Sequence, residues 1–558
     1  MLRFLVRCLL LAGIAGRALA QGGGANADLI LTNGRIYTSD DTRPVVEAVA
    51  VAGGKVLFAG NATGAMALKG PATRVVDLGG RTMIPGMVDA HGHVAGLGDA
   101  LHIVDLTGTT SYDEVVARVA ERAKRTPKGQ WVLGRGWDQN DWGDTRFPTH
   151  DKMTAAVPDH PVYIVRVDGH AGLANLKALQ AAGVTATTQD PSGGHIERSA
   201  DGAPAGVFVD NAQGLVRRAI PRQTRDEVKT SILDAVKEAQ RWGLTGVHDA
   251  GAGATELDVY EELAKAGQMK FRLNAMISDD AKTVDAWFKR GPLVAGYNGT
   301  LWVRSIKLYA DGALGSRGAA LLDPYTDDPK NTGLLVSAPA HIREVAAGAL
   351  KAGFQVNTHA IGDRGNRLVL DAYEAALKAT PTADHRFRVE HAQILNYDDI
   401  PRFAALGVIP SMQASHQTSD MYWAATRLGS GRLLGAYAWR SLLNTGVVVP
   451  NGSDFPVEQV NPLISFHSAV SRQDARDWPP GGWYPAERMT RDEALLAMTL
   501  WPAYSAFQEK VLGSLTPGKF ADFVVLDQDI MRVPAELLLR TKVLSTWVSG
   551  EKVYEAAP

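Results

Sequence analysis

The stretch Pro85-Gly86-Met87-Val88-Asp89-Ala90-His91-Gly92-His93 has the pattern of a short apolar strand that ends in two histidines. Side chains alternate along an extended strand, so His91 and His93 point to the same side. Similar short strands recur along the chain and alternate with helical patterns, which indicates parallel βαβ construction. With the first, they end at residues 89–93, 247–249, 273–276, 306–309, 356–359, 389–391, 409–412 and 448–454. Eight such units predict an α/β fold built on a (β/α)8 TIM barrel.

The spacing of these strands locates a long insertion. From the second strand onward the spacing is close to one βα unit, roughly 30 residues, with longer loops after the fourth and sixth strands. The first and second strands are much further apart, so residues from about 100–225 are predicted to form an insertion or lid. The barrel itself is assigned to residues 84–455, and residues 456–510 to helices that close it.

Both ends of the chain carry short β-strands. Asn33-Gly34, Gly53-Gly54 and Gly79-Gly80 each separate two such strands, and Asn-Gly is a strong signal for the mirror-image turn of a hairpin. The C-terminal strands turn in the same way at Ser549-Gly550. Neither end has enough strands for a stable sheet, and two separate hairpin modules would leave apolar edges exposed. We therefore predict one small β-sandwich built from residues 28–83 and 511–558.

The composition is that of a globular chain with more than one core. Its 558 residues exceed what a single core usually organises, and 45% apolar with 21% charged residues excludes a disordered tail or a fibre. Lys and Arg number 58 and Asp and Glu 60, for a formal charge of −2. Such a chain has no electrostatic basis for wrapping nucleic acid or an anionic membrane. The expected partner is a small-molecule substrate, and a homodimer is left open.

Residues 1–20 have the pattern of a secretory signal peptide. Arg3 and Arg7 precede an apolar run, and Ala18-Leu19-Ala20 is a small-residue cleavage signal. The following residues 21–27 are predicted to be a flexible linker. Cleavage after Ala20 would remove the single cysteine, Cys8, and no later apolar run reaches transmembrane length. The sequence therefore predicts an exported protein, periplasmic or secreted, with no membrane association after cleavage.

Residues of metal-binding type end five of the eight predicted strands. They are His91 and His93 on the first, Lys307 on the fourth, His359 on the fifth, His391 on the sixth and Asp454 on the eighth. The carboxyl ends of barrel strands meet at one mouth, where two imidazoles on one side make a pair of metal ligands. Single residues of this kind are more often satisfied core or surface groups. Five strand ends are hard to explain in that way, so we predict a metal site at the mouth.

Four further motifs accompany the strand ends. They are Gly134-Arg135-Gly136-Trp137-Asp138, Ala310-Asp311-Gly312-Ala313-Leu314-Gly315-Ser316-Arg317, Pro410-Ser411-Met412-Gln413 and Gly513-Ser514-Leu515-Thr516-Pro517-Gly518-Lys519-Phe520-Ala521-Asp522. With them the chain resembles the amidohydrolase superfamily of metal-dependent hydrolases, specifically the type 3 branch that includes N-substituted formamide deformylases. The resemblance covers nearly the whole chain after the signal peptide. Its motifs are specific for the superfamily and not for a substrate.

The resemblance implies a role for each strand-end residue. His91 and His93 would bind one divalent metal ion and His359 and His391 a second, while Lys307 would bridge both as a CO2-derived carbamate. A carbamate supplies two anionic oxygens, whereas an ammonium would be repelled by two dications. Asp454 would ligate one ion and act as general base. The ligand types suit zinc, with manganese, iron and nickel left open, and an unmodified Lys307 would favour a single ion.

Four other residues are weaker candidates for substrate binding. His416, beyond the seventh strand, either contacts the substrate or is a loop histidine without a role. His170 lies in the insertion and is a candidate to face the site through the lid. Trp137 forms either an apolar wall of the pocket or part of the insertion's own core. Arg317 either holds an anionic group of the substrate or pairs with a nearby carboxylate.

These observations predict an exported hydrolase that cleaves a non-peptide carbon–nitrogen bond by attack of a metal-activated water. A mouth covered by an aromatic lid suits a small amide, formamide or cyclic amide. An esterase or lactonase with the same metal site is the main alternative, because ester hydrolysis needs the same polarised carbonyl. A non-catalytic binding protein is a further alternative. It would be expected to have lost a metal ligand or the base, whereas Asp454 and all four histidines are present. A barrel glycosidase using Glu390 and Asp454 would leave the histidines unexplained.

Overall fold

The computed structural model describes residues 26–557. The predicted signal peptide, 1–20, and residues 21–25 of the predicted linker lie outside the described residues, so export stays a prediction. The first strand, β1 (Ala27–Thr32), begins at the last residue of that linker. Within the described range, no helix combines the length and the apolar character needed to cross a membrane.

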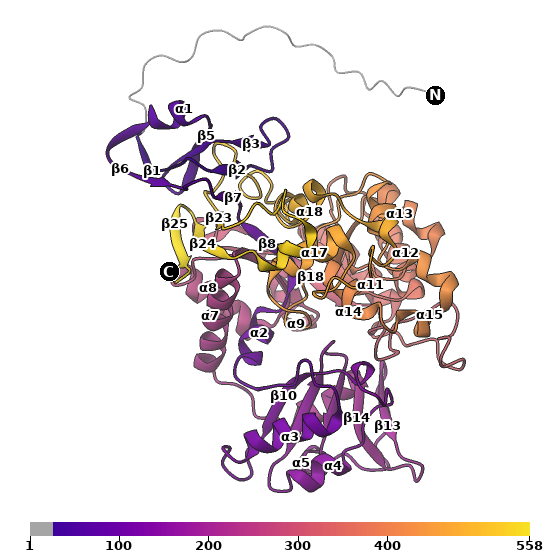
Figure 1. The fold of residues 1–558 in the computed structure, drawn as a ribbon. Helices are drawn as coiled ribbons and strands as arrows, with labels where there is room; N and C mark the ends of the chain where they lie inside the picture. The colour runs from indigo at the N-terminus through magenta and orange to yellow at the C-terminus, as the bar shows by residue number, and fades with distance from the viewer. Residues whose placement is uncertain (1–25, 558) are drawn as a thin grey trace.

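A parallel sheet of eight strands forms the centre of the molecule (Figure 1). In chain order these are β8 (Met87–Gly92), β15 (Leu244–Ala252), β16 (Arg272–Ser278), β18 (Leu301–Tyr309), β19 (Gln355–Ala360), β20 (Arg388–His391), β21 (Ile409–Gln413) and β22 (Asn451–Gly452). Each pairs with the next, and β17 (Leu293–Ala295) adds an antiparallel partner to β18. Backbone hydrogen bonds close the ladder: the Asp454 amide donates to the His91 carbonyl at 2.7 Å and the His93 amide to that of Phe455 at 2.8 Å. The predicted (β/α)8 barrel is confirmed.

Helices pack around the outside of this sheet (Figure 1). In α7 (Arg225–Arg241), Thr224 and Glu227 form a capping box at the N-terminus, and the buried side chains recur every three or four residues, as at Val228, Ile232 and Ala235. The following helices are α8 (Ala254–Lys265), α9 (Ala281–Arg290), α11 (Pro339–Ala352), α12 (Asp363–Ala379), α13 (Ile400–Leu406) and α14 (Ala414–Asp420). In the region predicted to close the barrel lie α17 (Pro462–Ser471), α18 (Arg491–Ala497) and α19 (Leu500–Ser505).

Two further sheets form the small sandwich at one end of the barrel. One, in the order β5-β4-β1-β6, comprises β5 (Lys55–Gly60), β4 (Ala48–Ala52), β1 and β6 (Lys69–Asp77). The other, in the order β25-β24-β23-β7-β2-β3, comprises β25 (Glu551–Glu555), β24 (Val543–Val548), β23 (Phe523–Leu526), β7 (Thr82–Pro85), β2 (Arg35–Tyr37) and β3 (Val45–Val46). Antiparallel pairing of β23 with β7 joins the two ends of the chain, as expected.

Two of the predicted hairpins are wrong. The strands around Asn33-Gly34, β1 and β2, lie in different sheets, and so do β6 and β7 around Gly79-Gly80. Both turns are corners at which the chain passes from one layer to the other, and they contact each other: the Gly80 amide donates to the Asn33 carbonyl at 2.7 Å. Left-handed backbone at Asn33, Gly79 and Gly80 serves such a corner as well as a hairpin, so the dipeptide signal does not separate them.

The insertion between β8 and β15 is a separate α/β unit (Figure 1). Its sheet has the order β13-β14-β12-β11-β10-β9, with β9 (Val104–Asp105), β10 (Val132–Trp137), β11 (Val162–Arg166), β12 (Ala171–Ala174), β13 (Gly194–Arg198) and β14 (Pro204–Asp210). Helices α3 (Tyr112–Ala123), α4 (Asp151–Ala156) and α5 (Leu176–Ala182) complete it. Its buried apolar residues form clusters of their own, separate from the barrel core.

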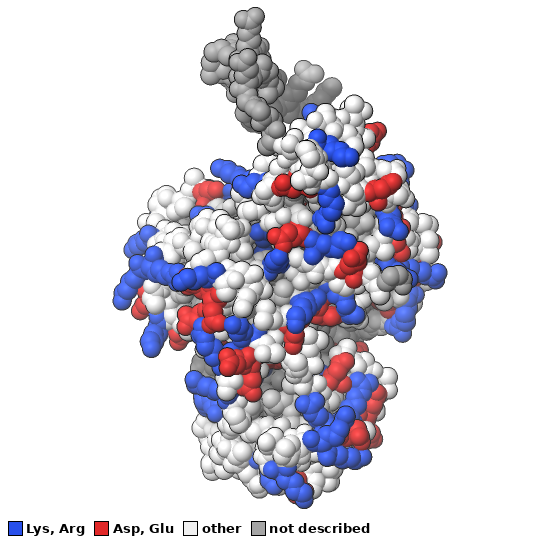
Figure 2. All heavy atoms as spheres, turned by 90° about the vertical axis from the view of Figure 1, so that its left-hand side faces the viewer, with Lys and Arg blue, Asp and Glu red and all other residues white. Residues whose placement is uncertain are grey.

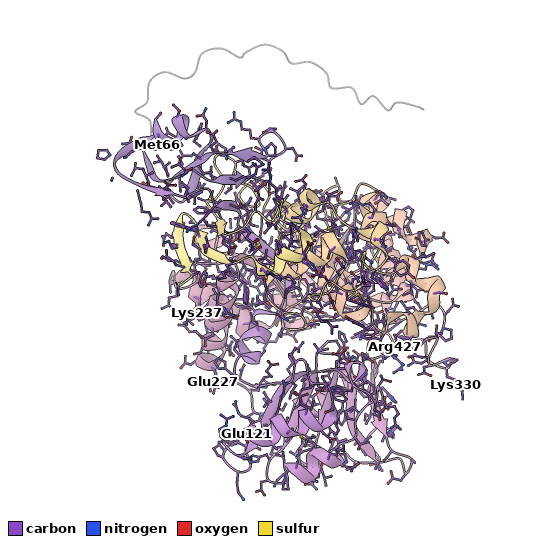
Figure 3. All side chains as sticks on the ribbon, viewed as in Figure 1. Met66, Glu121, Glu227, Lys237, Lys330 and Arg427 are labelled. Atoms are coloured by element: carbon purple, nitrogen blue, oxygen red, sulfur yellow. The ribbon has the colours of Figure 1, made fainter. Side chains whose placement is uncertain are left out.

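Polar contacts connect the insertion to the barrel. Arg427, labelled at the junction in Figure 3, donates to the Asn140 side chain of the insertion at 2.8 Å and pairs with Asp327. On the face seen in Figure 2, acidic and basic side chains are interspersed, as the small net charge leads one to expect.

A buried ion pair fastens the sandwich to the barrel. Arg272, at the start of β16, donates to both carboxylate oxygens of Asp522 at 2.7 and 2.8 Å. The same guanidinium donates to the Gly299 carbonyl at 2.8 Å and to the Ser549 hydroxyl at 2.7 Å, and it lies over the Phe520 ring, 4.1 Å from its centre. Removing one partner of a buried pair leaves the other charge without compensation.

We expect Arg272→Ala to lower the free energy of unfolding by about 3–5 kcal/mol, because Asp522 would stay buried without its partner. The measurement is urea unfolding followed by fluorescence. The matched control is Arg290→Ala, which removes a more exposed pair with Glu261 and should cost less than about 1 kcal/mol. Equal destabilisation by the two variants would contradict a special role for Arg272.

Candidate metal centre

The two histidines of the opening motif converge on the carboxylate that follows the last barrel strand. His91 Nε2 lies 3.6 Å and His93 Nε2 3.0 Å from Asp454 Oδ1. His91 ends β8 with its side chain fully buried, while His93 is partly exposed to the cavity. The residue spacing and the closing hydrogen bond between β8 and the β22 end together bring these three side chains to one point.

A second group of histidines shares the same carboxylate. Asp454 Oδ2 lies 3.6 Å from His416 Nε2, and the His416 ring stacks on that of His391 with centroids 5.8 Å apart. The His359 ring meets that of His391 edge-on at 4.6 Å. The donor atoms within each of two groups, His91-His93-Asp454 and His391-His416-Asp454, lie within 4.8 Å of one another. The structure thus adds His416 to the predicted ligand cluster.

Lys307 stands beside the first group. Its Nζ lies 3.4 Å from His91 Nε2 and 4.5 Å from the centre of the Tyr309 ring, and the side chain is almost fully buried. Among residues 26–557, no carboxylate comes within ion-pair distance of this nitrogen. A buried lysine without an acidic partner is uncommon, which sets this position apart from an ordinary structural ion pair.

Hydrogen bonds at the far side of the rings orient the imidazoles. His91 Nδ1 donates to Glu390 Oε2 at 2.5 Å, and His391 Nδ1 donates to Gln413 Oε1 at 2.6 Å. With the proton on Nδ1, each Nε2 keeps its lone pair for the cavity. Carboxylate and carbonyl acceptors behind ligating histidines are the usual outer support of a metal site.

An arginine holds the outer carboxylate in turn. Arg388 donates to Glu390 Oε2 at 2.9 Å, to the Ala90 carbonyl at 2.7 Å and to the Ser411 hydroxyl at 2.7 Å. Burial would raise the pKa of Glu390, but the charge of Arg388 and the hydrogen bond from His91 outweigh it and hold that pKa below its ordinary value. Glu390 is therefore ionised and serves as a fixed acceptor for His91.

Burial and neighbouring charges give the histidines and Asp454 the protonation states that metal ligands need. Burial lowers the pKa of His91 to about 4, and the Lys307 charge acts in the same direction. Burial and neighbouring positive charges also place the pKa values of His359 and His391 well below the ordinary value. Burial would raise the pKa of Asp454, but its interactions with the His91 and His93 imidazoles, among them a hydrogen bond from His93, hold it well below its usual range. Neutral imidazoles and an ionised carboxylate are what a metal ion requires.

The residues present therefore fit a divalent metal ion. His416 Nε2 is buried and has no hydrogen-bond partner among the described residues, although it faces the cluster. Three or four imidazoles around one carboxylate provide the nitrogen and oxygen donors that zinc and similar ions bind. His359 Nε2 lies 3.4 Å from the Gly312 carbonyl. With the proton on Nε2, which then donates to this carbonyl, the lone pair of His359 is on Nδ1.

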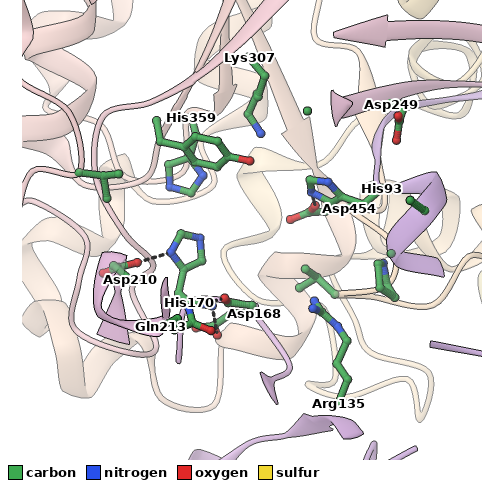
Figure 4. A pocket seen from close by; sticks show the side chains of 18 of the residues that line it. His93, Arg135, Asp168, His170, Asp210, Gln213, Asp249, Lys307, His359 and Asp454 are labelled. Atoms are coloured by element: carbon green, nitrogen blue, oxygen red, sulfur yellow. Dashed lines mark hydrogen bonds and ion pairs between the residues drawn. The ribbon is translucent and has the colours of Figure 1, made fainter. Parts of the chain in front are cut away.

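The cavity over this cluster is closed on one side by the insertion. Its volume is about 430 Å³, and Figure 4 shows His170 and Arg135 entering it opposite His359 and Asp454. His170 Nδ1 donates to Asp210 at 2.5 Å, and its ring lies 5.1 Å from that of His359. His170 thus faces the site through the insertion. A larger neighbouring cavity of about 1010 Å³ shares His359, His391 and Asp454 with the first.

Two predicted substrate contacts lie elsewhere. Trp137 is fully buried in the insertion's own core, where its indole N–H donates to the Ile164 carbonyl at 3.1 Å and its ring packs on Trp142. Of the two roles considered for Trp137, pocket wall and core of the insertion, the structure places it in the core. Arg317 pairs with Asp327 at 2.8 Å, in a loop with left-handed backbone, and does not line either cavity. Residue type alone does not distinguish a tryptophan or an arginine that contacts a substrate from one that belongs to a core or an ion pair.

The residues that support the imidazoles could not be recognised in the sequence. Gln413 was part of a recognised motif without a role, and Glu390 entered only as a glycosidase alternative. Two signals for these supporting residues were available in the sequence: a glutamate directly before the ligand His391, and a glutamine that ends β21. Their partners, however, come from other strands, so only the three-dimensional ladder assigns them. Arg135 in the insertion was missed for the same reason.

Known proteins are similar to this chain over nearly its whole length. A profile of the Amidohydrolase family matches residues 74–554. The chain is 35% identical over 551 residues to Protein LONG AFTER FAR-RED 3 of Arabidopsis thaliana, covering 96% of this chain and 93% of that protein. It is 29% identical over 550 residues to an N-substituted formamide deformylase of Arthrobacter pascens, covering 95% and 98%. The predicted resemblance is confirmed.

A solved structure is similar over most of the chain. The crystal structure of an uncharacterized metal-dependent hydrolase from Pyrococcus horikoshii OT3 aligns with a TM-score of 0.74 at 27% identity, over 91% of this chain and 99% of that one.

We expect Gln413→Leu to weaken metal binding by about 10- to 100-fold, because His391 Nδ1 would lose the acceptor that fixes its ring. The measurement is calorimetric titration of metal-free protein with zinc. The control is Gln240→Leu, which removes a buried glutamine that donates to the Lys270 carbonyl far from the cluster. An unchanged zinc affinity in Gln413→Leu would contradict the orienting role.

Proposed function

The chain belongs to the amidohydrolase family, and from that membership and the geometry of the histidine cluster we propose that it hydrolyses the carbon–nitrogen bond of small non-peptide amides with the aid of a divalent metal. The observation that carries the proposal is the convergence of His91, His93, His391 and His416 on the Asp454 carboxylate, with the outer nitrogens of His91 and His391 held by acceptors. Formamides are the first substrate class to test, because one relative is named for that activity.

The metal ion and the protein would divide the chemistry between them. Bound by these histidines and Asp454, a divalent ion supplies a Lewis acid that lowers the pKa of water and polarises a carbonyl oxygen. Asp454, whose low pKa keeps it ionised, accepts a proton from the attacking water. The same carboxylate then gives that proton to the departing nitrogen as the carbon–nitrogen bond breaks. The products are a carboxylic acid and an amine, and no covalent intermediate with the protein is needed.

Lys307 is proposed to complete the ligand set as a carbamate. Its neutral amine adds to CO2 and releases one proton, which leaves a carbamate whose carbon is bonded to Nζ and whose two oxygens share one negative charge. The burial of Lys307, its 3.4 Å distance from His91 Nε2 and the absence of an acidic partner among residues 26–557 support this modification. Zinc is the proposed ion, because histidine, carboxylate and carbamate ligands suit it.

The size of the cavity supports a small substrate. About 430 Å³ beside the cluster lies within the range that accommodates a small organic molecule. The insertion closes one side of this space with His170 and Arg135. An extended peptide chain would need an open groove on both sides of the scissile bond, so a compact amide is the better match.

We expect Asp454→Asn to lower kcat per bound metal for formamide hydrolysis by roughly 10²- to 10⁴-fold, because the carboxamide cannot accept the proton. Activity would be assayed as released formate, with metal content measured on the same samples so that a lost ligand is separated from a lost base.

Asp201→Asn, in an exposed turn of the insertion, is the control and should keep wild-type activity. If Asp454→Asn retained wild-type turnover per metal ion, Asp454 would not be the base. If metal-loaded wild type hydrolysed neither formamides nor other small amides, the proposed activity would fall.

A further inference from the structure

Arg135 places a positive charge in the cavity without an acidic partner. It lies on β10 of the insertion, and Figure 4 shows its guanidinium directed into the cavity toward Asp454. Among the described residues, no carboxylate lies within 4.0 Å of this guanidinium. Most buried or half-buried arginines of this chain do have one: Arg166 pairs with Asp138 and Asp168, Arg272 with Asp522 and Arg388 with Glu390.

The backbone of the insertion fixes this side chain. Arg135 Nη2 donates to the Val167 carbonyl at 2.8 Å. Gly169 lies in the same turn, where its φ of +76° favours glycine, and a Cβ there would be in ordinary contact with the two terminal nitrogens, at 3.5 and 3.6 Å. Gln213 holds the turn by donating to the Gly169 carbonyl at 2.9 Å. The buried Nε of Arg135 has no hydrogen-bond partner among the described residues, so the guanidinium is positioned but not saturated.

Four of the five carboxylates that line this cavity are engaged by other groups, Asp249 among them through the Val94 amide and the Tyr260 hydroxyl; Glu256 has no such partner among the described residues. Asp168 pairs with Arg166 at 2.5 Å and Asp210 with His170 at 2.5 Å. Asp454 is surrounded by the histidines of the metal cluster. A second guanidinium on the same cavity wall, Arg217, donates only to the Gln213 side chain at 2.9 Å among the described residues. Two arginines without acidic partners therefore face a site that would itself carry positive metal ions.

The neighbouring cavity is richer in carboxylates. Eight carboxylates and three arginines line it, against five carboxylates, two arginines and Lys307 in the first cavity. Burial raises the pKa of Asp420 to about 7 and that of Asp141 to about 6, so these two carboxyl groups are neutral more often than exposed ones. An anionic group that enters from the mouth meets fewer carboxylates on the side of Arg135.

We propose that Arg135 binds a carboxylate of the substrate, so that the preferred substrate is a small amide bearing a carboxylate. This inference rests on the proposed amide hydrolysis and adds the substrate class. The guanidinium presents a planar fork that matches a carboxylate, and its Nη1 makes no hydrogen bond among the described residues, while Nη2 already donates to the Val167 carbonyl. Arg217 adds a second, more exposed positive charge, and the carbonyl to be attacked would lie toward Asp454.

The test compares two substrates that differ only in the carboxylate, N-formylphenylalanine and N-formylphenethylamine, on zinc-loaded wild type, Arg135→Gln and Arg135→Lys. We expect wild type to prefer the carboxylated substrate by roughly 10- to 100-fold in kcat/KM, the size of a charge-assisted hydrogen-bonded pair. Arg135→Gln should abolish that preference, mainly through KM, because the substrate carboxylate loses its charged partner. Arg135→Lys should restore part of the preference, because it keeps the charge but not the fork.

A binding measurement decides the question without turnover. Benzylsuccinate carries one more carboxylate than 3-phenylpropionate, and calorimetry on zinc-loaded protein should show tighter binding of benzylsuccinate to wild type by at least about 10-fold. That gain should disappear in Arg135→Gln and persist in Arg146→Gln, an exposed arginine of the insertion that pairs only with Asp144. Thermal unfolding and metal content confirm that the variants are folded and loaded.

Equal effects of Arg135→Gln on both members of each pair would overturn the proposal and leave Arg135 as a structural neighbour of Asp454. Hydrolysis of the neutral formamide without preference for the carboxylated one would overturn it while the proposed function stands. If neither formamide is hydrolysed, the proposed function fails, and the benzylsuccinate comparison still decides whether Arg135 binds a carboxylate.

Discussion

The hydrogen bond from the Asp454 amide to the His91 carbonyl, 2.7 Å long, joins the end of the eighth barrel strand to the first, and the metal cluster depends on it. A barrel has no free edge only when its first and last strands pair. Here the pairing occurs at the residues whose side chains form the cluster, so closing the sheet also fixes the distance between His91, His93 and Asp454. Left-handed backbone at Asp454 and His391 turns these side chains at the strand ends.

Buried groups behind the cluster support this arrangement. Arg388 joins the Ala90 carbonyl of β8 to Glu390 of β20 and Ser411 of β21, so one side chain ties three strands together next to His91. A network of this kind is stable only when each member is satisfied, because an unpaired buried charge is costly. The orientation of His91 thus depends on strands far apart in the sequence, and the barrel must be complete before the site exists.

Much of this could be predicted from the sequence because it depends on local periodicity. Alternation along β8 puts His91 and His93 on one side, and the βα rhythm puts His359, His391 and Asp454 at the same mouth. The corners at Asn33-Gly34 and Gly79-Gly80 could not be predicted, because a left-handed turn is equally suited to a hairpin and to a change of sheet. Trp137, Gln413 and Arg135 could not be assigned either, since their surroundings are set by contacts between separate elements.

The central proposal is a metal centre in which a carbamate on Lys307 would help to hold two ions, and the metal content of the purified protein tests it most directly. Protein prepared without chelator, in the presence of bicarbonate and zinc, would be compared with Lys307→Ala by elemental analysis. The account predicts about two zinc equivalents per chain in wild type and a sharp decrease in the variant. One equivalent that survives the substitution would contradict the bridge, and no bound metal in wild type would contradict the metal centre itself.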